Sequence, residues 1–360
     1  MAVLMDDLVE ECLLRLPPED PASLVRAALV CKRWHHLISG RRFRELHRTP
    51  PLLGFVGTLA GGTHRPFMPH FVPTSSFRPP PRAAELGDWV AIHSCHGRVL
   101  LYKSRRELPE LSWYPIPTFS WNAAVVCNTS SADAGAGCDH LHCIRVSFVI
   151  FVATLYNETT VTSVYSSDAD AWSDQTSTQV RLISQFYLAT GAIAGNAIYF
   201  NNSASTELIK YDLTTRDVSA INLPDQAFLK DIALMAMENS RLGCATLYGS
   251  MLHMWSTEVG PNNRDVRWEQ SRVIELDTLL PADALSSKTC LLAGCADGGE
   301  VILLWTASCF LCVDLKSRRI KEVEGGSRLS NFAVPVTSFC TLQHWESACT
   351  DEGSGGEPFE

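Results

Sequence analysis

After residue 50 the chain repeats one local pattern: a short apolar run, a polar turn and a second short run. In ELIKYDL, Ile209, Tyr211 and Leu213 alternate with polar neighbours, which is the two-residue period of a β-strand. The following LTTRDV places a polar turn before another strand, as a hairpin requires. Since no amphipathic helix of convincing length separates these runs, the pattern predicts an all-β domain and argues against a parallel α/β fold.

Four of these units resemble one another and recur at intervals of roughly 40–60 residues, which is typical of β-propeller blades. They are VYSSDADAW (164–172), IKYDLTTRDVSAI (209–221), RVIELD (272–277) and CVDLKSRRIKEV (312–323). About 290 residues at about 50 per blade predict about six blades, with five or seven as alternatives. The competing architecture is one or two β-sandwiches, which would show similar strand spacing without a whole-blade repeat.

Residues 1–49 follow a helical period instead. In MDDLVEECLLRLPP the apolar residues recur at helical spacing up to Pro17, which ends the helix because it lacks an N–H and clashes with the preceding turn. A second helix begins after Asp20, and a third contains Trp34. Three helices of roughly ten residues are too small a bundle to bury all of their aliphatic side chains. Some of these side chains must therefore face outward, which indicates a protein interface.

The N-terminal residues resemble the F-box. The matching features are the acidic start, L-x-R-L-P-P, L-V-R, V-C-K-R-W, L-I-S and the closing R-F-R-E-L-H, in this order. The family usually opens with Leu-Pro, whereas Met5 follows Leu4 here, so the departure affects the first helical turn and the affinity for an adaptor. The β region is similar to the F-box-associated region of large plant F-box families through Y-S-S-x-x-x-x-W, Y-D-L, I-x-L-P and W-x-x-x-x-V-I-E-L-D.

These resemblances imply a multidomain chain, with a small all-α F-box helical module over 1–49 and an all-β, propeller-like substrate-recognition domain over 50–345. An acidic, Gly-rich tail over 346–360 is expected to be disordered. The implied function is the substrate-recruiting subunit of a Skp–cullin–F-box ubiquitin ligase. Such a subunit binds a Skp-family adaptor and, through it, the cullin and the RING subunit, while the sequence does not identify its target protein. The alternative is a non-ligase protein-binding module with a degenerate F-box, which Met5 favours.

Eight residues of the module are candidates for contacting the adaptor or supporting that contact. Trp34 is expected chiefly to hold the helices together. Target recognition is expected on the connections 60–82, 128–142 and 257–267, because binding residues concentrate on loops held by a rigid scaffold. The eight adaptor-binding candidates are Leu8, Val9, Leu16, Pro17, Leu24, Val30, Cys31 and Trp34.

The overall composition limits the other partners. There are 30 Lys and Arg against 39 Asp and Glu, a net charge of −9, so we expect no attraction to nucleic acid or to an anionic membrane. The longest apolar run, 146–156, is about half as long as a membrane helix. The acidic N-terminus lacks the basic flank of a secretory signal. Thirteen cysteines in such a chain indicate reduced thiols in the cytoplasm, the nucleus or both.

Several short motifs have a catalytic or metal-binding interpretation, but a structural role is favoured for each. CDHLHC (138–143) groups four ligand-type residues without a second pair at zinc spacing. In CFLC (309–312) the two cysteines of a strand point to opposite faces, and Cys95-His96 has no evident orienting carboxylate. We therefore expect no catalytic residue, metal or cofactor, and an enzyme of the propeller class is only the third hypothesis.

The remaining motifs are assigned to packing and turns. ADGGE (296–300) and GGSR (325–328) are predicted to be hairpin turns, since neither opens a helix as a phosphate loop does. Six tryptophans in strand-like contexts are predicted to lie in the core between blades. They are Trp89, Trp113, Trp172, Trp255, Trp268 and Trp305.

Overall fold

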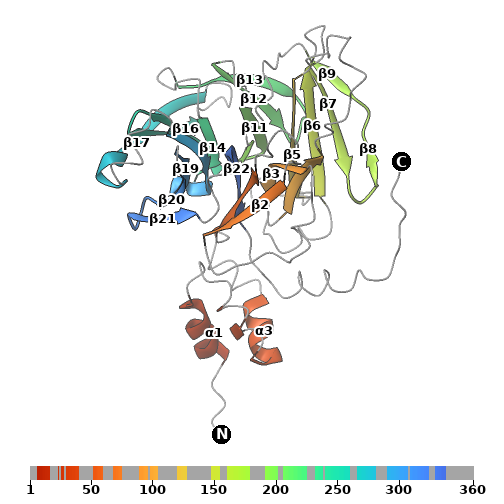
Figure 1. Cartoon of the computed structure of the whole chain (residues 1–360). Helices are drawn as coiled ribbons and strands as arrows, with labels where there is room; N and C mark the ends of the chain where they lie inside the picture. The colour runs from red at the N-terminus through yellow and green to blue at the C-terminus, as the bar shows by residue number, and fades with distance from the viewer. Residues whose placement is uncertain are drawn as a thin grey trace.

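The computed structural model describes two helices near the N-terminus and a large β domain. Helices α1 (Asp6–Leu14) and α3 (Lys32–Ser39) lie side by side at one end of the molecule, below the β domain in Figure 1. In the part of the chain that is described, no helix is long and apolar enough to cross a membrane. The described residues are 6–16, 23, 26, 27, 30–39, 52–59, 68–74, 89–95, 98–103, 120–127, 147–154, 160–178, 191–201, 206–224, 232–237, 240–259, 266–280, 290–306, 309–323 and 329–337.

The strands of the first half of the β domain form a hairpin and two larger sheets, all antiparallel. The hairpin consists of β3 (Trp89–Cys95) and β4 (Arg98–Lys103). The next sheet contains β5 (Ser120–Cys127), β6 (Ser147–Thr154), β7 (Thr160–Ser166), β8 (Ala171–Trp172) and β9 (Thr176–Thr178), and both β8 and β9 pair with β7. A four-stranded sheet follows with β10 (Ala192–Ala194), β11 (Ala197–Asn201), β12 (Glu207–Asp212) and β13 (Val218–Asn222).

The second half adds two four-stranded sheets and one sheet that joins the two ends of the domain. The four-stranded sheets are β14 (Ile232–Ala236), β15 (Leu242–Tyr248), β16 (Met251–Val259) and β17 (Val266–Glu275), then β18 (Leu291–Cys295), β19 (Val301–Trp305), β20 (Phe310–Asp314) and β21 (Arg319–Val323). The joining sheet has the order β2 (Met68–Pro73), β1 (Leu52–Leu59) and β22 (Leu329–Thr337). In it the last strand pairs with the first, with Val56 opposite Val334, which closes the ring.

Neighbouring sheets around this ring share buried side chains. Phe200 lies in the cluster that joins the β5–β9 sheet to the β10–β13 sheet, and Trp255 lies in the next cluster, which continues to the β14–β17 sheet. Further clusters join the β14–β17 sheet to the β18–β21 sheet and, around Phe55, the β18–β21 sheet to the joining sheet. Another cluster links the joining sheet to the β3–β4 hairpin. The hairpin then meets β5, where His93 accepts a hydrogen bond from the backbone N–H of Val125 at 3.3 Å.

This closed ring of antiparallel sheets is a β-propeller, as predicted, and not a sandwich. Among the described residues five sheets have three to five strands and are blades, so the propeller shows five blades, one of the alternatives to the expected number of about six. The difference arises between β2 and β5, where the described residues form only the two-stranded hairpin β3–β4. The number of blades was expected from the length of the domain and an average blade length. Such an estimate could not reveal the hairpin, whose described residues occupy a place in the ring with only two strands.

Three of the four predicted repeat units are hairpins, namely β7–β8, β12–β13 and β20–β21. In the last two an aspartate at the strand end caps the turn. Asp212 Oδ1 accepts the N–H groups of Thr214 and Thr215, and Asp314 accepts those of Lys316 and Ser317. The unit at 272–277 was predicted wrongly, since β17 ends at its Glu and a 3₁₀ helix (Leu276–Thr278) follows, burying Leu276 completely.

The glycine-containing turn at 296–300 is confirmed as the connection between β18 and β19, with Cys295 opposite Ile302. Gly299 has a φ of 71° in this turn, and a Cβ there would lie 2.4 Å from the Met254 methyl carbon. Glycine is therefore needed both for the backbone conformation and for the space. The predicted turn at 325–328 lies outside the described residues.

Some expectations for loops and tryptophans need correction. The connection 60–82 contains strand β2, and the connection 257–267 is shorter than predicted because β16 continues to Val259 and β17 begins at Val266. The third connection, 128–142, and the tail after 345 lie outside the described residues. Trp172 is not in the core but 56% exposed, because β8 is a two-residue strand at the edge of its sheet. Of the other predicted core tryptophans, Trp255 is buried, Trp89, Trp268 and Trp305 are partly buried, and Trp113 is outside the described residues.

Candidate adaptor-docking surface

The sequence of helix α1 explains where the helix begins and where it ends. Acidic Asp7 stands in the first turn, where negative charge interacts favourably with the helix dipole. Glu11 and Arg15 form an exposed i,i+4 ion pair at 2.8 Å, which contributes about 0.3–0.5 kcal/mol. The backbone N–H of Leu16 bonds to the carbonyl of Leu13, so the helix tightens at the point where the sequence continues with two prolines.

The helical module has a small core of its own. Val9 and Leu13 of α1 are one turn apart and bury their side chains against Ala27 and Ile38. All four lie within the N-terminal module. The partly buried side chains packed against them are Leu14, Leu16, Trp34 and Leu37.

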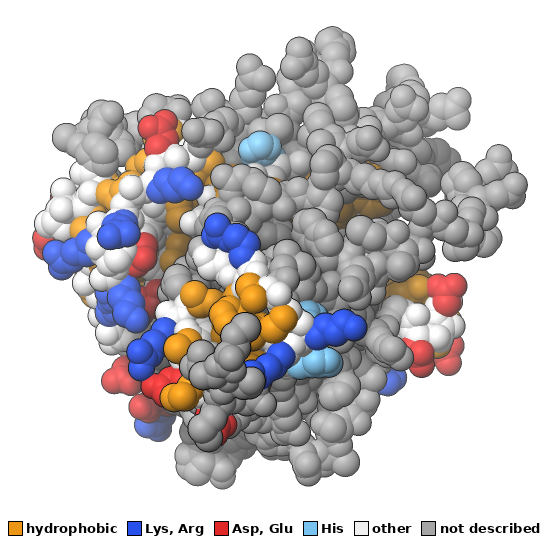
Figure 2. Space-filling view, turned by 90° about the horizontal axis from the view of Figure 1, so that it is seen from below, with side chains coloured by type: hydrophobic (Ala, Val, Ile, Leu, Met, Phe, Trp, Pro, Cys, Tyr) orange, Lys and Arg blue, Asp and Glu red, His pale blue; other side chains and the backbone are white. Residues whose placement is uncertain are grey.

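A second apolar stripe of α1 faces outward. Leu8 is 51% exposed and Cys12, one turn later, is also exposed. Val30, directly before α3, is 62% exposed, and its neighbour Cys31 is exposed as well. Figure 2 views the molecule from the helical end and shows hydrophobic atoms surrounded by Lys, Arg and His side chains. Among the described residues the module thus combines a covered stripe with an uncovered one, and we call Leu8, Cys12, Val30 and Cys31 the outer apolar stripe.

The predicted adaptor contacts that the structure describes divide between the module core with its packed neighbours and the outer apolar stripe. Val9 is buried in the module core, so it supports the helices and does not reach the surface. Cys12 was not among the candidates, although its i,i+4 spacing from Leu8 is a signal that sequence reasoning could have used. Of the remaining seven candidates, Leu8, Val30 and Cys31 are exposed, Leu16 and Trp34 are partly buried, and Pro17 and Leu24 lie outside the described residues. Contact of any of them with an adaptor remains a prediction.

The model of the β-propeller of AT5G49610-like F-box proteins matches residues 133–340, which are 208 of the 360 residues and more than half of the chain. The chain belongs to this family. A separate model of the F-box domain matches residues 4–46, which include both helices and the outer apolar stripe. An F-box followed by a propeller is the domain combination of an F-box substrate-recognition protein. Members of such families are generally non-catalytic adaptors, and F-box domains generally bind Skp-type adaptors.

Solved structures resemble this F-box propeller protein only distantly. The SapL1 lectin, solved with alpha methyl fucoside, is 7% identical and matches 78% of this chain and 98% of its own length with a TM-score of 0.42. The extracellular domain of BT4673 from B. thetaiotaomicron is 12% identical and matches 75% of this chain and 29% of its own length, with a TM-score of 0.28. The GH43_1 enzyme from Xanthomonas citri is 9% identical and matches 81% of this chain and 97% of its own length, with a TM-score of 0.27. No curated protein sequence matches the chain. Because these TM-scores are below 0.5, the fold assignment rests on the sheet topology.

Five of the described propeller cysteines lie in its cores or pack against them. Cys312 lies in the cluster between the β18–β21 sheet and the joining sheet, whereas Cys309 packs against the opposite cluster, so the two point to opposite faces as predicted. Burial raises the pKa of the Cys312 thiol to about 11, and it also raises the pKa of Cys244 and Cys295. Raised thiol pKa values disfavour the reactive thiolate.

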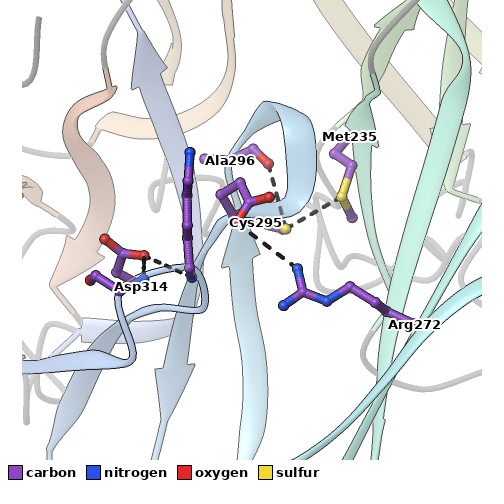
Figure 3. Close-up of polar contacts among 8 residues, drawn as sticks. Met235, Arg272, Cys295, Ala296 and Asp314 are labelled. Carbon is purple, nitrogen blue, oxygen red and sulfur yellow. Dashed lines mark hydrogen bonds and ion pairs between the residues drawn. The ribbon is translucent and has the colours of Figure 1, made fainter.

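Cys295 illustrates why these contacts are structural. Its Sγ lies 3.5 Å from Met235 Sδ and 3.6 Å from the carbonyl oxygen of Ala296, and all three are buried (Figure 3). Nearby in Figure 3, Arg272 of β17 approaches Glu300 at 3.9 Å. These contacts link the β14–β17 sheet to the β18–β19 turn, where they stabilise the junction of two blades.

The other candidate chemical sites do not assemble in the described residues. No group of three or more His, Cys, Asp and Glu that could hold a metal ion occurs among them. CDHLHC (138–143) and His96 lie outside the described residues, and Cys95 ends strand β3. The outer apolar stripe is therefore the best supported functional surface of this family member.

Proposed function

We propose that this protein is the substrate-recruiting subunit of a Skp–cullin–F-box ubiquitin ligase. In this proposal residues 1–49 bind a Skp-family adaptor, which connects the chain to the cullin and the RING subunit. Residues 50–345 bind the target protein, and residues 346–360 form a tail outside both domains. The partners place this function in the cytoplasm, the nucleus or both.

The outer apolar stripe is the observation that supports the proposal. The module core uses Val9 and Leu13, so Leu8 and Val30 contribute little to it and remain exposed to solvent. Since about half of each side chain is already covered, burying the rest on binding contributes about 1 kcal/mol for each of them. An F-box match over the same residues makes a Skp-type adaptor the partner of choice.

The proposed mechanism is proximity. A target held on the propeller places its lysines near the ubiquitin thioester that the cullin assembly carries, which raises their effective concentration. Such a mechanism needs no nucleophile or metal in this chain, and it agrees with the packing of the described propeller cysteines.

A degenerate F-box in a non-ligase binding protein is the second candidate function. Met5 favours it, because the family has proline at this position and proline would preset the first helical turn. The two candidates differ in one property, namely binding to a Skp-type adaptor.

Co-purification of the full chain with a recombinant Skp-type adaptor tests the proposal. The wild-type chain should bind, and Leu8→Asp should abolish co-purification because it places a charge in the apolar contact. The matched control is Val273→Asp on β17, where an apolar side chain of similar exposure (45%) lies on the propeller, and it should bind like wild type. Absence of binding by the wild-type chain would favour the degenerate F-box. Binding by Leu8→Asp within a few-fold of wild type would show that the interface lies elsewhere.

A further inference from the structure

The hairpin β7–β8 carries an aromatic pair at the outer edge of its sheet, in which Trp172 is exposed and Tyr165 is partly buried. Tyr165 and Trp172 stand opposite each other in the strand register, and their ring centroids are 5.4 Å apart at an angle of 52°. Trp172 is 56% exposed, and β8 lies at the right side of the propeller in Figure 1, far from α1 and α3. Large exposed aromatic side chains are enriched at binding hot spots.

The hairpin is held in one conformation by hydrogen bonds on both sides of the aromatic pair. The hydroxyl of Tyr165 donates to Asp170, and the backbone N–H of Ser173 donates to the carbonyl of Val164 at 2.8 Å. In return, the N–H of Val164 donates to Ser173 Oγ at 3.0 Å. A partner would therefore meet a preorganised surface and would not have to order the hairpin on binding.

The charged residues of the chain segment around the pair have a single sign. Residues 146–180 contain no Lys or Arg, but they contain four acidic residues. Three of these, Asp168, Asp170 and Asp174, are exposed on the hairpin itself. At the right of Figure 2, on the side where Figure 1 places β8, red carboxylates lie close to a small hydrophobic area. A surface of this kind attracts cations and repels acidic segments.

We propose that the aromatic hairpin, defined as Tyr165, Asp168, Asp170, Trp172 and Asp174, is a docking site for a basic linear segment of the target protein. A Lys or Arg of that segment stacks on the indole of Trp172, and a neighbouring basic residue pairs with Asp168 or Asp174. Asp170 holds Tyr165 and thereby positions the aromatic pair. An exposed indole binds a cation through its ring face, and nearby carboxylates strengthen that preference.

This inference rests on the proposed function in one respect, since the partner is the target protein. It also assigns target binding to residues that are not part of the three connections that the sequence pointed to. The signal in the sequence was the long run without basic residues around a tryptophan, but the strand context of Trp172 favoured a core position.

A degenerate peptide library tests the chemistry of the partner. Eight-residue peptides with each amino acid fixed in turn are incubated with the immobilised full-length protein, and the bound peptides are sequenced. Lys and Arg should be enriched at two or more nearby positions. A fluorescent peptide made from the selected sequence then gives dissociation constants.

Three variants separate the hairpin from other surfaces. Trp172→Ala should lower the affinity for the selected peptide about ten-fold. The double change Asp168→Asn/Asp174→Asn should lower it about five-fold, and this second effect should be smaller in high salt. The control Tyr248→Ala removes an aromatic side chain that is 59% exposed on another blade, and it should leave the affinity unchanged. Enrichment of acidic or purely apolar residues, or equal binding by Trp172→Ala, would overturn the inference.

The outcome for the hairpin is distinguishable from the outcome for the ligase function. Leu8→Asp should no longer bind the adaptor but should still bind the basic peptide. Trp172→Ala should bind the peptide more weakly but should still bind the adaptor. A protein that binds the adaptor but selects no basic peptide leaves the proposed function in place and refutes the docking site.

Discussion

The propeller and the helical module bury their apolar side chains to different extents. The propeller covers them in a series of clusters between neighbouring sheets, in which Phe55, Phe200 and Phe310 are completely buried. In the described part of the helical module only four hydrophobic residues are buried, and Leu8 and Val30 stay exposed. The described propeller therefore has a continuous series of cores with single exposed side chains such as Trp172 and Tyr248, whereas the described module has a four-residue core beside exposed apolar side chains of its helices.

Size and shape explain this difference. A closed ring gives each sheet two neighbours, so both faces of a strand such as β12 are covered, with Leu208 in one cluster and Ile209 in the next. Short helices in a module of this size cover only one stripe of each described helix. The uncovered stripe is available for a partner, which is why the smaller part of the chain is the part expected to bind the adaptor.

The largest expected effect is on the propeller alone. Phe200→Ala removes a completely buried ring between two blades and should lower the free energy of unfolding of the propeller by about 3–5 kcal/mol. Chemical denaturation followed by tryptophan fluorescence measures it. Adaptor binding below the unfolding midpoint should not change, because the buried core of the module contains none of the described propeller residues.

The control for this variant is Tyr248→Ala, which truncates an exposed aromatic ring and should change the free energy of unfolding by less than about 0.5 kcal/mol. If Phe200→Ala also removed adaptor binding under conditions where the propeller remains folded, the two parts would be coupled and the comparison would fail.

The alternation of the strands was predictable because each strand packs on two neighbours. Ile209, Tyr211 and Leu213 do face one cluster, as the two-residue period indicated. The hairpins with a capping aspartate were also predictable, since Asp212 and Asp314 recur at the same place in their units. The number of blades was not, because it depends on which strands pair over long distances and on a hairpin that occupies a blade position with two strands.

The candidate site was predictable as a region but not residue by residue. The sequence shows that α1 has more apolar residues than one stripe can hold, but it does not say which stripe meets the other helices. Val9 and Leu8 are neighbours of the same type, yet one is buried and the other is exposed. A similar ambiguity led to the wrong position of Trp172, since an apolar residue in an edge strand has the same local pattern as one in a central strand.

The second prediction concerns pH and again affects the propeller. His93 of β3 is fully buried, and burial lowers its pKa to about 4, although a hydrogen bond with the Gly191 backbone raises it. Its Nδ1 accepts the N–H of Val125, so a proton on that nitrogen would face a donor. The unfolded chain binds a proton below pH 6.5, and the folded chain does so only near pH 4. The neutral state of His93 therefore contributes about 3 kcal/mol to the free energy of unfolding. This contribution is complete above pH 6.5 and is lost progressively as the pH falls from 6.5 to 4.

Denaturation midpoints of the propeller at pH 7.5 and pH 5 measure this loss, which should be about 2 kcal/mol at pH 5. The variant His93→Gln removes the titration, so its midpoint should depend less on pH than that of the wild type even if its stability is lower overall. An equally steep dependence in the variant would assign the effect to other residues. The adaptor should still bind the module at pH 5.5, where the propeller is weakened but folded.

The smallest effect on stability is expected for Leu8→Ala, in a direct test of the two stripes that compares two leucines of the same helix. Leu13 is 2% exposed and Leu8 is 51% exposed, although both belong to α1. Leu13→Ala should lower the free energy of unfolding of the module by about 2–3 kcal/mol, whereas Leu8→Ala should change it by less than about 0.5 kcal/mol. Amide hydrogen exchange of the full chain measures the stability of the module. In Leu13→Ala exchange should be faster in α1 and α3 and unchanged in the propeller strands. Leu8→Ala should weaken adaptor binding while leaving exchange at the wild-type rate. If it accelerated exchange as much as Leu13→Ala, Leu8 would belong to the module core, and the outer apolar stripe would have no surface to offer.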